Sequence, residues 1–295
     1  MTTPVHVVKR TGFYSSEDLG IILKELREEL PMIEVKINPD VYPTGSDLSI
    51  VNAARRSFNT RSTWENETDG LLWGGTPVLR EKDKRLLEFL ARGMTADDFG
   101  VLVCDIEDLF DACEYEGAVE ELWKFRNTPT HDTPFNHTFI SFEVKAPIFV
   151  RAQLVKHEYL IMSEFSRRYK TDDIEFYTPD VWRKAAPDKK QGSLDESVDV
   201  GDLGELEYSV EVTSALEFYE MLLEKGVAPE QARMVLPQST MTEWTWSGTL
   251  GAFAKMCRLR LHPEAQHEAR IVAEQVYKYL KEYYPVAAPA LVEGV

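Results

Sequence analysis

The chain contains few of the features that stabilise secreted domains or hold a protein in a membrane. Its 295 residues include only three cysteines, Cys104, Cys113 and Cys257, with no pair at C-x-x-C spacing. This argues against a disulfide framework and against a zinc ribbon. No apolar run approaches the roughly 20 residues that span a bilayer, and the first residues lack a basic region followed by an apolar one. We therefore expect a cytoplasmic protein that does not contact membranes.

Positive charge is also scarce. The chain has 33 Lys and Arg against 50 Asp and Glu, a formal net charge of -17. Because nonspecific affinity for nucleic acid comes mainly from neutralising phosphates, we expect no nucleic-acid partner. The basic residues nevertheless cluster at 156–170 and 255–260, and a cleft focuses local potential. The composition therefore allows a small anionic ligand in a basic pocket.

Hydrophobic residues make up 43% of the chain and charged residues 28%, which is typical of a globular protein with a sizeable core. We find no internal repeat and expect one domain over 1–295. An acidic, turn-rich insertion occupies about 59–128, and a polar segment at about 182–202 indicates a mobile surface loop. A solvated decoration, an active-site cover, a subunit contact and a partner-binding surface remain open for the insertion.

Periodicity predicts both strands and helices. Alternating apolar residues indicate strands, and apolar residues at helical spacing indicate helices, several of them with capping signals. The predicted strands are 5–8, 33–37, 138–144 and 174–177, and the predicted helices are 19–30, 49–58, 81–92, 118–125, 147–160, 203–225, one from Pro229, 248–261 and 262–284. The apolar stripe of the 203–225 helix is expected to be core.

The stretch 145–169 combines polar chemistry with a hydrophobic run. Pro147 suits the first turn of the helix predicted at 147–160, because its missing N–H would be unpaired there anyway. At helical spacing an aromatic ring, an amide, an ammonium and an imidazole share one side. These four residues are Phe149, Gln153, Lys156 and His157. Such a face is unusual for core packing alone.

The segment 164–169 has the alternating pattern of an extended backbone rather than the pattern of a helix. If its backbone is extended, Glu164, Ser166 and Arg168 project to one side. A carboxylate, a hydroxyl and a guanidinium in a row suit a ligand with donors at one end and an anionic oxygen cluster at the other, as in a nucleoside monophosphate. An ordinary surface ion-pair segment is the alternative, and the segment alone leaves both open.

Three further features carry possible chemistry. His131 and His137 lie six residues apart without a further ligand at a recognised spacing, so we expect no metal site. Cys257, beside Lys255 and Arg258, is the only plausible cysteine nucleophile, although such a residue is more often a small core side chain. A guanidinium such as that of Arg233, placed among apolar residues, needs an anionic partner or exposure.

Several motifs together resemble the flavin-dependent thymidylate synthases. That family's signature is Arg-His-Arg, seven residues and then Ser; here Lys156-His157-Glu158 is followed by seven residues and Ser166. The resemblance covers most of 48–285 outside 59–128 and 182–202. Other matching runs are Ala53-Ala-Arg-x-Ser57-Phe58, His131-x-Thr-Pro-Phe-x-His137, Glu175-Phe-Tyr177, Ala232-Arg233-x-Val-Leu-Pro237, Thr242-x-x-x-Trp246, and Leu259-Arg260 with Ala265-Gln266-x-Glu268.

The resemblance implies an α+β fold, with a mixed or antiparallel sheet and long helices, in a single catalytic domain that forms a homotetramer with sites between subunits. It implies a catalytic role for Arg260, which would polarise the pyrimidine ring, and for His157. The residues implied to hold the nucleotide are Gln153, Glu164, Ser166, Arg167, Arg168, Arg233 and Arg260. Those implied to line the flavin region are Ser57, His131, Thr133, Lys156, His157, Glu158, Thr249 and Lys255.

The implied reaction transfers a one-carbon unit from methylenetetrahydrofolate to C5 of dUMP, with FAD as the hydride carrier and NADPH as the reductant. The chain departs from the family mainly on the flavin side, at Lys156, Glu158, Thr249, Gly251 and Lys255, and also at Glu264. A glutamate in place of arginine would repel a pyrophosphate. A hydroxymethylase acting on dUMP or dCMP with altered or absent flavin use, and a silent nucleotide-binding scaffold, therefore remain alternatives.

Overall fold

The computed structural model describes residues 31–41, 43–67, 76–91, 96–127, 131–187 and 193–293. The strand predicted at 5–8 and the helix predicted at 19–30 lie outside the described residues. Within the described part, none of the helices is long and apolar enough to cross a membrane.

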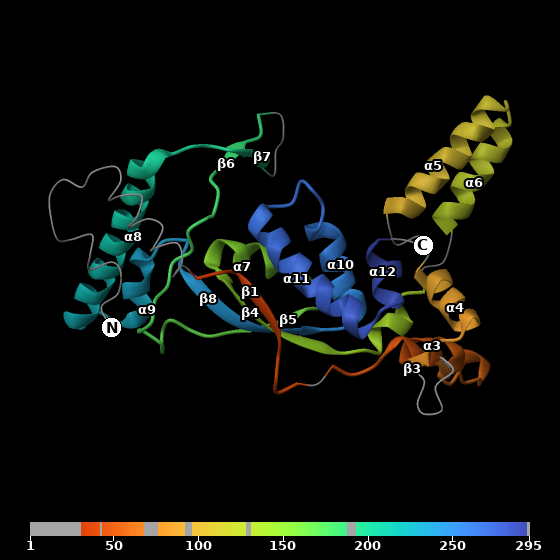
Figure 1. The fold of residues 1–295 in the computed structure, drawn as a ribbon, viewed down its shortest axis with the longest axis horizontal. Helices are drawn as coiled ribbons and strands as arrows, with labels where there is room; N and C mark the ends of the chain where they lie inside the picture. The colour runs from red at the N-terminus through yellow and green to blue at the C-terminus, as the bar shows by residue number, and fades with distance from the viewer. Residues whose placement is uncertain are drawn as a thin grey trace.

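A four-stranded antiparallel sheet forms the centre of the molecule (Figure 1). Its strands are β1 (Glu34–Ile37), β4 (Ile140–Pro147), β8 (Met241–Gly248) and β5 (Ile161–Glu164), in the order β1-β4-β8-β5. Alternation fixes the register, because Phe142 pairs with Trp246 and Val144 with Trp244, and all four are buried on one face. The predicted α+β class with an antiparallel sheet is confirmed.

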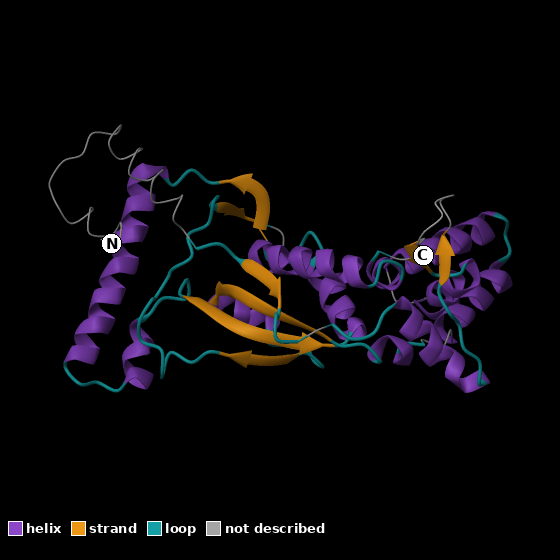
Figure 2. Ribbon diagram, turned by 60° about the horizontal axis from the view of Figure 1, so that its bottom comes forward, coloured by secondary structure: helices purple, strands orange, loops and turns teal. Residues whose placement is uncertain are grey.

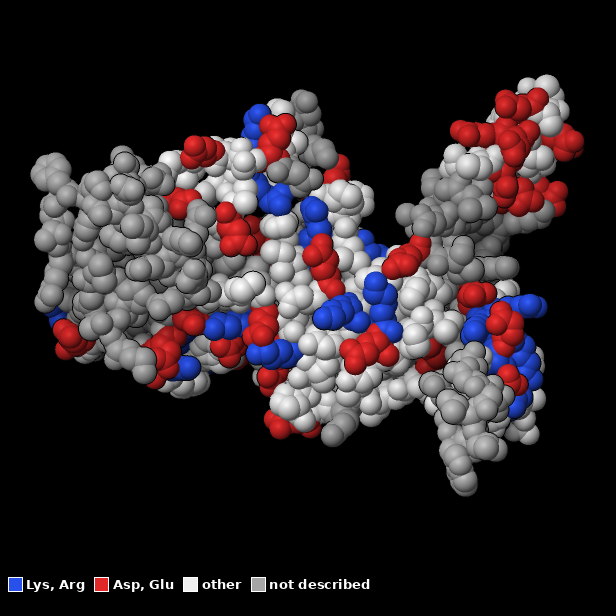
Figure 3. Space-filling view, viewed as in Figure 1, with Lys and Arg blue, Asp and Glu red and all other residues white. Residues whose placement is uncertain are grey.

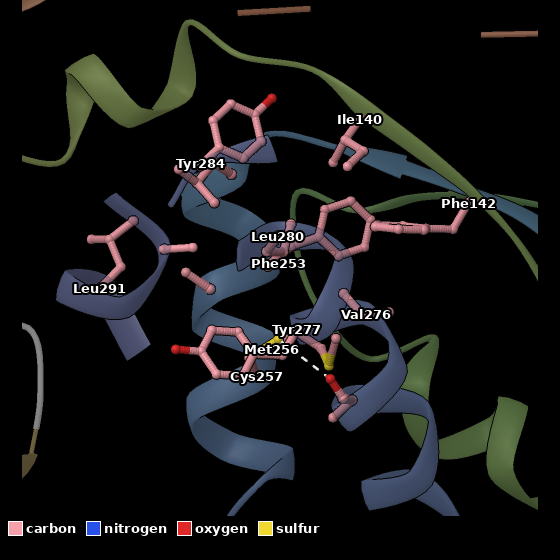
Figure 4. Packing of buried hydrophobic residues seen from close by; sticks show 14 of the residues in the cluster. Ile140, Phe142, Phe253, Met256, Cys257, Val276, Tyr277, Leu280, Tyr284 and Leu291 are labelled. Atoms are coloured by element: carbon pink, nitrogen blue, oxygen red, sulfur yellow. Dashed lines mark hydrogen bonds between the residues drawn. The ribbon is translucent and has the colours of Figure 1, made fainter. Parts of the chain in front are cut away.

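Two long helices, α10 (Leu250–Arg260) and α11 (His267–Tyr283), pack near this apolar face. The Phe253 ring of α10 meets the ring of Phe142 edge-on, with centroids 5.0 Å apart (Figure 4). It meets the ring of Trp246 in the same way at 5.3 Å. Truncating such a ring to alanine typically costs about 3 to 5 kcal/mol. The helix that ends at Arg260 is therefore firmly held against the sheet.

Cys257 lies in this core (Figure 4). Its thiol is 3.9 Å from the carbonyl oxygen of Ala273, and burial raises its pKa well above the ordinary value. A thiol that stays protonated in an apolar site is a poor nucleophile. The interpretation of Cys257 as a small core residue is confirmed.

Hydrogen bonds to a buried carboxylate join the start of helix α3 to the start of helix α12, far apart in the sequence. Helix α3 (Asp47–Arg55) begins after Ser46, which forms a capping box with Ser49. The buried carboxylate of Asp47 accepts hydrogen bonds from the N–H groups of Val286 (2.9 Å) and Ala287 (3.0 Å), at the start of α12 (Ala287–Val292). Nearby lie the short helix η1 (Arg56–Phe58), the helix α4 (Glu81–Ala91) and the hairpin of β2 (Glu65–Glu67) and β3 (Thr76–Val78).

Helices project at both ends of the molecule (Figures 1 and 2). At one end lies α8 (Gly201–Glu224), followed by α9 (Pro229–Ala232) and η3 (Arg233–Val235). At the other end, α5 (Ala96–Asp111) and α6 (Tyr115–Asn127) form an acidic hairpin (Figure 3). Helix α5 was not predicted. The core interpretation of the α8 stripe is largely wrong, because Tyr219 is buried whereas Val212 and Leu216 are half-buried.

The stretch 147–169 folds differently from the prediction. Helix α7 covers only Ile148–Leu154, and a turn follows in place of the predicted helix to residue 160. The extended backbone predicted over 164–169 is wrong beyond Glu164, where β5 ends. The N–H of Tyr169 donates to the carbonyl of Ser166 at 2.9 Å, which closes a turn. Alternation therefore does not describe the side chains after Glu164.

Two other short segments also differ. The strand predicted at 174–177 is reduced to a single bridge between Phe176 and Thr240. Where a loop was expected at 182–202, β6 (Arg183–Ala185) pairs with β7 (Ser193–Ser197) in an antiparallel hairpin. The remaining small element, η2 (Thr133–Asn136), precedes β4. The β6–β7 hairpin matters because residues of both strands line the main pocket.

Candidate functional site

A pocket of about 870 Å³ lies where α7, α8, α10 and α11 approach the 177–183 segment. This volume is within the range of sites that hold a cofactor or a drug-sized ligand. The lining residues are Phe149, Gln153, Lys156, Tyr177, Pro179, Val181, Trp182, Arg183, Ser193, Tyr208, Ser239, Arg260, Glu264, Ala265, Gln266 and Glu268. Three predicted site residues, Gln153, Lys156 and Arg260, are among them. The shared helix side predicted for Gln153 and Lys156 does not form, because α7 ends at Leu154, although both residues line the pocket.

Arg260 is the last residue of α10, where the helix dipole favours a cation. Its Nε donates to Nε2 of His157 at 2.9 Å, and its Nη2 donates to the backbone carbonyl of Gln153 at 3.4 Å. Burial lowers the pKa of its guanidinium below the ordinary value, although the group stays charged. The two contacts hold the guanidinium at the pocket wall and leave Nη1 and one N–H of Nη2 outside them.

His157 supports Arg260 as a neutral ring. Burial first, and then the positive charges of Arg260 and Lys255, lower its pKa from 6.5 to about 4. A neutral imidazole that accepts at Nε2 carries its proton at Nδ1. At neutral pH the ring therefore accepts from Arg260 without adding positive charge to the pocket.

Gln153 and Gln266 form a side-chain pair at the same wall. The Nε2 group of Gln153 donates to Oε1 of Gln266, which stands just before α11. Both residues line the pocket. With Nε2 engaged in this way, Oε1 is the atom of the Gln153 amide that is available to accept from a ligand.

An aromatic wall faces these polar groups. The rings of Phe149 and Tyr177 have centroids 6.1 Å apart, and those of Trp182 and Tyr208 are edge-to-face at 5.5 Å. The hydroxyl of Tyr208 donates to the carbonyl of Tyr177 at 2.7 Å, which joins α8 to this segment. Such a wall suits a planar ring. Sequence periodicity placed Phe149 beside Gln153 on the predicted helix and Tyr208 in a core stripe, and it gave Trp182 no role. Tyr177 stood in one of the motifs that carried the family resemblance.

Glu164 lies outside this pocket. It is the last residue of β5, on the same face of the sheet as Trp244. Its carboxylate accepts from Thr242 Oγ1 at 2.7 Å and forms an ion pair with Arg151 at 2.8 Å. Within this chain Glu164 therefore links β5, β8 and α7.

The other residues predicted for the nucleotide, Ser166, Arg167, Arg168 and Arg233, do not line this pocket either. Arg167 is buried and donates to the backbone carbonyls of Asp172 (2.9 Å) and Met241 (3.4 Å), beside a second cavity of about 200 Å³. Arg168 is exposed, and its Nε donates to Ser166 Oγ at 3.2 Å. Arg233 is exposed on η3, which satisfies the requirement for exposure or a partner.

The residues predicted for the flavin region form two groups along α10. Lys156, His157, Glu158 and Lys255 gather near the end of α7, with Lys255 Nζ 6.0 Å from the exposed ring of Tyr159. At the other end of α10 stand the N-cap Thr249 and the exposed residues His131 and Thr133, and Ser57 is exposed on η1.

Gly251 shows how the second group is packed. Thr249 Oγ1 donates to Asn136 Oδ1 at 2.7 Å, which joins α10 to η2. A Cβ at Gly251 would lie only 2.8 Å from that same Oδ1. The glycine, where the resembling family has arginine, therefore lets Asn136 approach the start of α10.

The arrangement of His, Cys, Asp and Glu side chains in the described residues gives little support for a metal site. In the part of the chain that the structure describes, no group of three or more His, Cys, Asp and Glu side chains is placed to hold a metal ion. The ring of His131 instead stacks on Phe89 with centroids 5.9 Å apart.

Large apolar side chains beside several predicted site residues are exposed. Phe58 follows Ser57 and is 79% exposed, Tyr159 follows Glu158 at 78%, Tyr169 follows Arg168 at 81%, and Met234 follows Arg233 at 77%. Apolar groups exposed in this way are typical of surfaces that another molecule covers.

Known proteins match this chain in sequence and in structure. A family model described as thymidylate synthase complementing protein matches residues 41–286. The flavin-dependent thymidylate synthase from one strain of Thermus thermophilus is 42% identical over 163 residues, which are 55% of this chain and 60% of that enzyme. The enzyme of the same name from Thermosipho africanus is 37% identical over 158 residues, which are 52% of this chain and 68% of that enzyme.

A solved structure covers more of the chain. The UMP/dUMP methylase PolB from Streptomyces cacaoi, bound with 5-Br dUMP, has a TM-score of 0.63 and 25% sequence identity, over 90% of this chain and 96% of that chain. The sequence match to the Thermus relative spans less than two thirds of its length, whereas the structural match spans nearly all of both chains.

Proposed function

The chain belongs to the thymidylate synthase complementing protein family, and from this premise we propose that it methylates C5 of dUMP with methylenetetrahydrofolate as the one-carbon donor. The family resemblance read from the sequence motifs is thereby confirmed. In the proposed reaction, FAD carries the hydride and NADPH supplies it. The pyrimidine nucleotide occupies the 870 Å³ pocket beside α10.

The observation that supports this most is the arrangement around Arg260. Its guanidinium stands at the pocket wall, held by His157 Nε2 and the Gln153 carbonyl. C5 of a uracil ring attacks an electrophilic carbon as part of an enolate form of the ring, in which negative charge lies on a carbonyl oxygen. A fixed guanidinium in a half-buried site stabilises that charge, which lowers the barrier. The aromatic wall formed by Tyr177 and Trp182 keeps the ring in plane.

His157 acts on the reaction through Arg260. As a neutral acceptor with a pKa of about 4 it fixes the direction of the guanidinium across the physiological pH range. A protonated imidazole would repel the same guanidinium. In this proposal Arg260 contacts the substrate and His157 positions it.

The lysines near Tyr159 supply positive charge that would suit an anionic dinucleotide. Lys156 and Lys255 supply two ammonium groups, and the Tyr159 ring offers an exposed face close to Lys255. At the other end of α10, Thr249, Thr133 and Ser57 supply hydroxyl groups. When bound there, FAD would supply the hydride that reduces the methylene carbon. Glu158, exposed in this region, is the one predicted flavin residue that opposes a pyrophosphate.

The proposal includes a homotetramer with sites between subunits. Gln153 and Arg260 line the pocket, whereas Ser166, Arg168 and Arg233 do not line the pocket of their own chain. The exposed side chains Tyr169 and Met234 stand beside these arginines. A neighbouring subunit that covered them would bring the phosphate-binding arginines to the pocket of the first.

The test is a product analysis with the purified protein. We expect dTMP when dUMP and methylenetetrahydrofolate are supplied with FAD and NADPH, and no product when either redox component is left out. Mass spectrometry of the nucleotide separates the methyl product from a hydroxymethyl one. The Arg260→Ala variant should lose turnover by about 100-fold or more while retaining most nucleotide binding.

Each alternative has its own signature in this experiment. A hydroxymethyl nucleotide formed from dUMP or dCMP without flavin would replace the methylase with a hydroxymethylase. Nucleotide binding without turnover under every cofactor condition would indicate a silent scaffold. A visible flavin absorption spectrum of the purified protein would support the methylase and argue against both.

A further inference from the structure

The side-chain pair of Gln153 and Gln266 carries a consequence for substrate choice. The Nε2 donor and the Oε1 acceptor of a glutamine amide have nearly the same size, so the amide can flip and exchange their positions at little steric cost. Its orientation in a pocket is set by the partner that engages one end. Here Nε2 of Gln153 donates to Oε1 of Gln266, and both side chains are half-buried at the pocket wall.

We propose that Gln266 is a specificity-determining residue, which fixes the Gln153 amide so that its Oε1 faces the pyrimidine and selects uracil over cytosine. This inference rests on the proposed function, because it takes the nucleotide to be bound in this pocket. Gln266 acts through Gln153 and is a positioning residue.

The hydrogen-bonding edges of the two bases explain the selection. Uracil presents a donor at N3 between two carbonyl acceptors, whereas cytosine has an acceptor at N3 and an amino group at C4. The pocket lining offers an acceptor, Gln153 Oε1, and a donor group, the guanidinium of Arg260, whose Nη2 lies 3.4 Å from the backbone carbonyl oxygen of Gln153. Uracil satisfies this wall when N3–H donates to Gln153 and a ring carbonyl accepts from Arg260. Cytosine in the same position places the N3 lone pair against the Gln153 oxygen, which leaves both acceptors unpaired.

Separate contacts hold the backbone and the side chain of Gln153, which supports the positioning role of Gln266. Gln153 lies in α7 and Gln266 just before α11, 113 residues apart. Arg260 Nη2 donates to the backbone carbonyl of Gln153. The backbone of Gln153 is therefore held by Arg260 and its side chain by Gln266. Without Gln266 the backbone would stay in place while the amide became free to present either end.

Two substitutions at Gln266 separate the orientation effect from simple loss of packing. Glutamate at this position can only accept, so Gln266→Glu keeps Gln153 Nε2 engaged and Oε1 facing the base. Leucine can neither donate nor accept, so Gln266→Leu frees the amide. The matched control is Gln238→Leu, the same change at an exposed glutamine outside the pocket lining.

The experiment measures dissociation constants of dUMP and dCMP by isothermal titration calorimetry, together with kcat and KM for dUMP. We expect Gln266→Leu to lower the preference for dUMP over dCMP by about tenfold, the equivalent of one hydrogen bond, with a larger effect on KM than on kcat. Gln266→Glu and Gln238→Leu should keep the preference of the parent protein. Thermal unfolding identifies a variant that has lost its fold, and Gln266→Met then provides the apolar comparison.

Two results would overturn the inference. One is an unchanged ratio of dUMP to dCMP affinity in folded Gln266→Leu while the parent protein makes dTMP, which leaves the proposed function standing. The other is a parent protein that prefers dCMP, or that binds neither nucleotide, which contradicts the proposed function as well.

Discussion

At the scale of single residues, the pocket depends on how the donors of Arg260 are distributed. A guanidinium has five N–H donors in a rigid fork and no acceptor, so its direction is set by the acceptors around it. Nε is taken by His157 and one Nη2 donor by the Gln153 carbonyl. The remaining three donors, two on Nη1 and one on Nη2, can meet an oxyanion without first breaking either of these contacts. Lysine at this position could not reproduce the arrangement.

The lowered pKa of His157 predicts how stability depends on pH. The unfolded chain takes up a proton at His157 near pH 6.5, whereas the folded chain does so only near pH 4. Between these values the unfolded state binds more protons, so folding stability falls as the pH falls from about 6.5 towards 4. His157→Gln removes this component. We expect the urea midpoints of parent and variant to converge as the pH is lowered, and a constant difference from pH 7.5 to 4.5 would contradict the lowered pKa.

Asp47 is a second residue whose environment permits a prediction. Its buried carboxylate accepts from the N–H groups of Val286 and Ala287. Asp47→Ala would leave both donors buried and unpaired, at a cost of about 2 to 5 kcal/mol. Chemical denaturation followed by circular dichroism measures this loss. The same substitution at the exposed Asp40 should change stability by less than about 0.5 kcal/mol, and equal effects at the two sites would contradict the assigned role.

At the scale of elements, sequence periodicity located most of the long segments. The strand at 33–37 and the helices at 81–92 and 203–225 are present with nearly the predicted bounds. These segments are long or strongly alternating, so local pattern and tertiary structure agree. The turn after Glu164 and the end of α7 at Leu154 were missed, because contacts with β8, far along the chain, decide where β5 and α7 stop.

Roles in the site were harder to predict than elements. Lys156 and Gln153 both line the pocket, although the helix whose spacing was expected to bring them together ends at Leu154. The aromatic wall was not found, since Trp182 and Tyr208 come from a predicted loop and from a stripe that was assigned to the core. Gln266 stood in a recognised motif, but only its contact with Gln153 gives it a role. Long-range contacts of this kind leave no periodic signal in the sequence.

The junction of β8 with the segment after α7 yields a prediction at the element scale. A Cβ at Gly248 would lie 2.5 Å from Leu160 Cδ2 and 3.3 Å from the carbonyl oxygen of Tyr159. Gly248→Ala should therefore displace the segment that carries His157, with a loss of about 1 to 3 kcal/mol of stability and a raised KM for the nucleotide. Denaturation and steady-state kinetics measure both effects.

The control for this substitution is a glycine with more space. At Gly117, in α6, the nearest atom to an added Cβ is Leu109 Cδ2 at 3.4 Å, an ordinary contact. Gly117→Ala should stabilise the protein by about 0.5 to 1 kcal/mol, because alanine favours the helix. Identical effects of the two substitutions would mean that crowding at Gly248 does not restrain the 155–160 segment.

At the scale of the whole molecule, the predicted nucleotide residues fall into two sets. Gln153 and Arg260 line one pocket, whereas Arg168 and Arg233 stand on exposed surface next to Tyr169 and Met234. Under the proposed function, a lone chain would bind the nucleotide without these two arginines and would leave Tyr169 and Met234 exposed to water. Both difficulties are removed if one subunit's arginines complete the pocket of another, which is the arrangement that the family resemblance implied.

Shared sites predict complementation between inactive variants. Arg260→Ala damages the pocket of its own subunit, and Arg168→Ala damages the site completed on its neighbour, so each variant alone should be inactive. In mixed oligomers formed by refolding the two at equal amounts, about a quarter of the sites combine an intact pocket with an intact arginine, and we expect about a quarter of the parent turnover.

The control is a mixture of Gln153→Ala and Arg260→Ala. Both residues line the same pocket, so every pocket in the mixed oligomers carries one of the two substitutions and no activity should return. Light scattering and native mass spectrometry verify that mixed oligomers have formed. If those oligomers remain inactive with the Arg168 variant, Arg168 serves the pocket of its own chain and the shared-site arrangement is wrong.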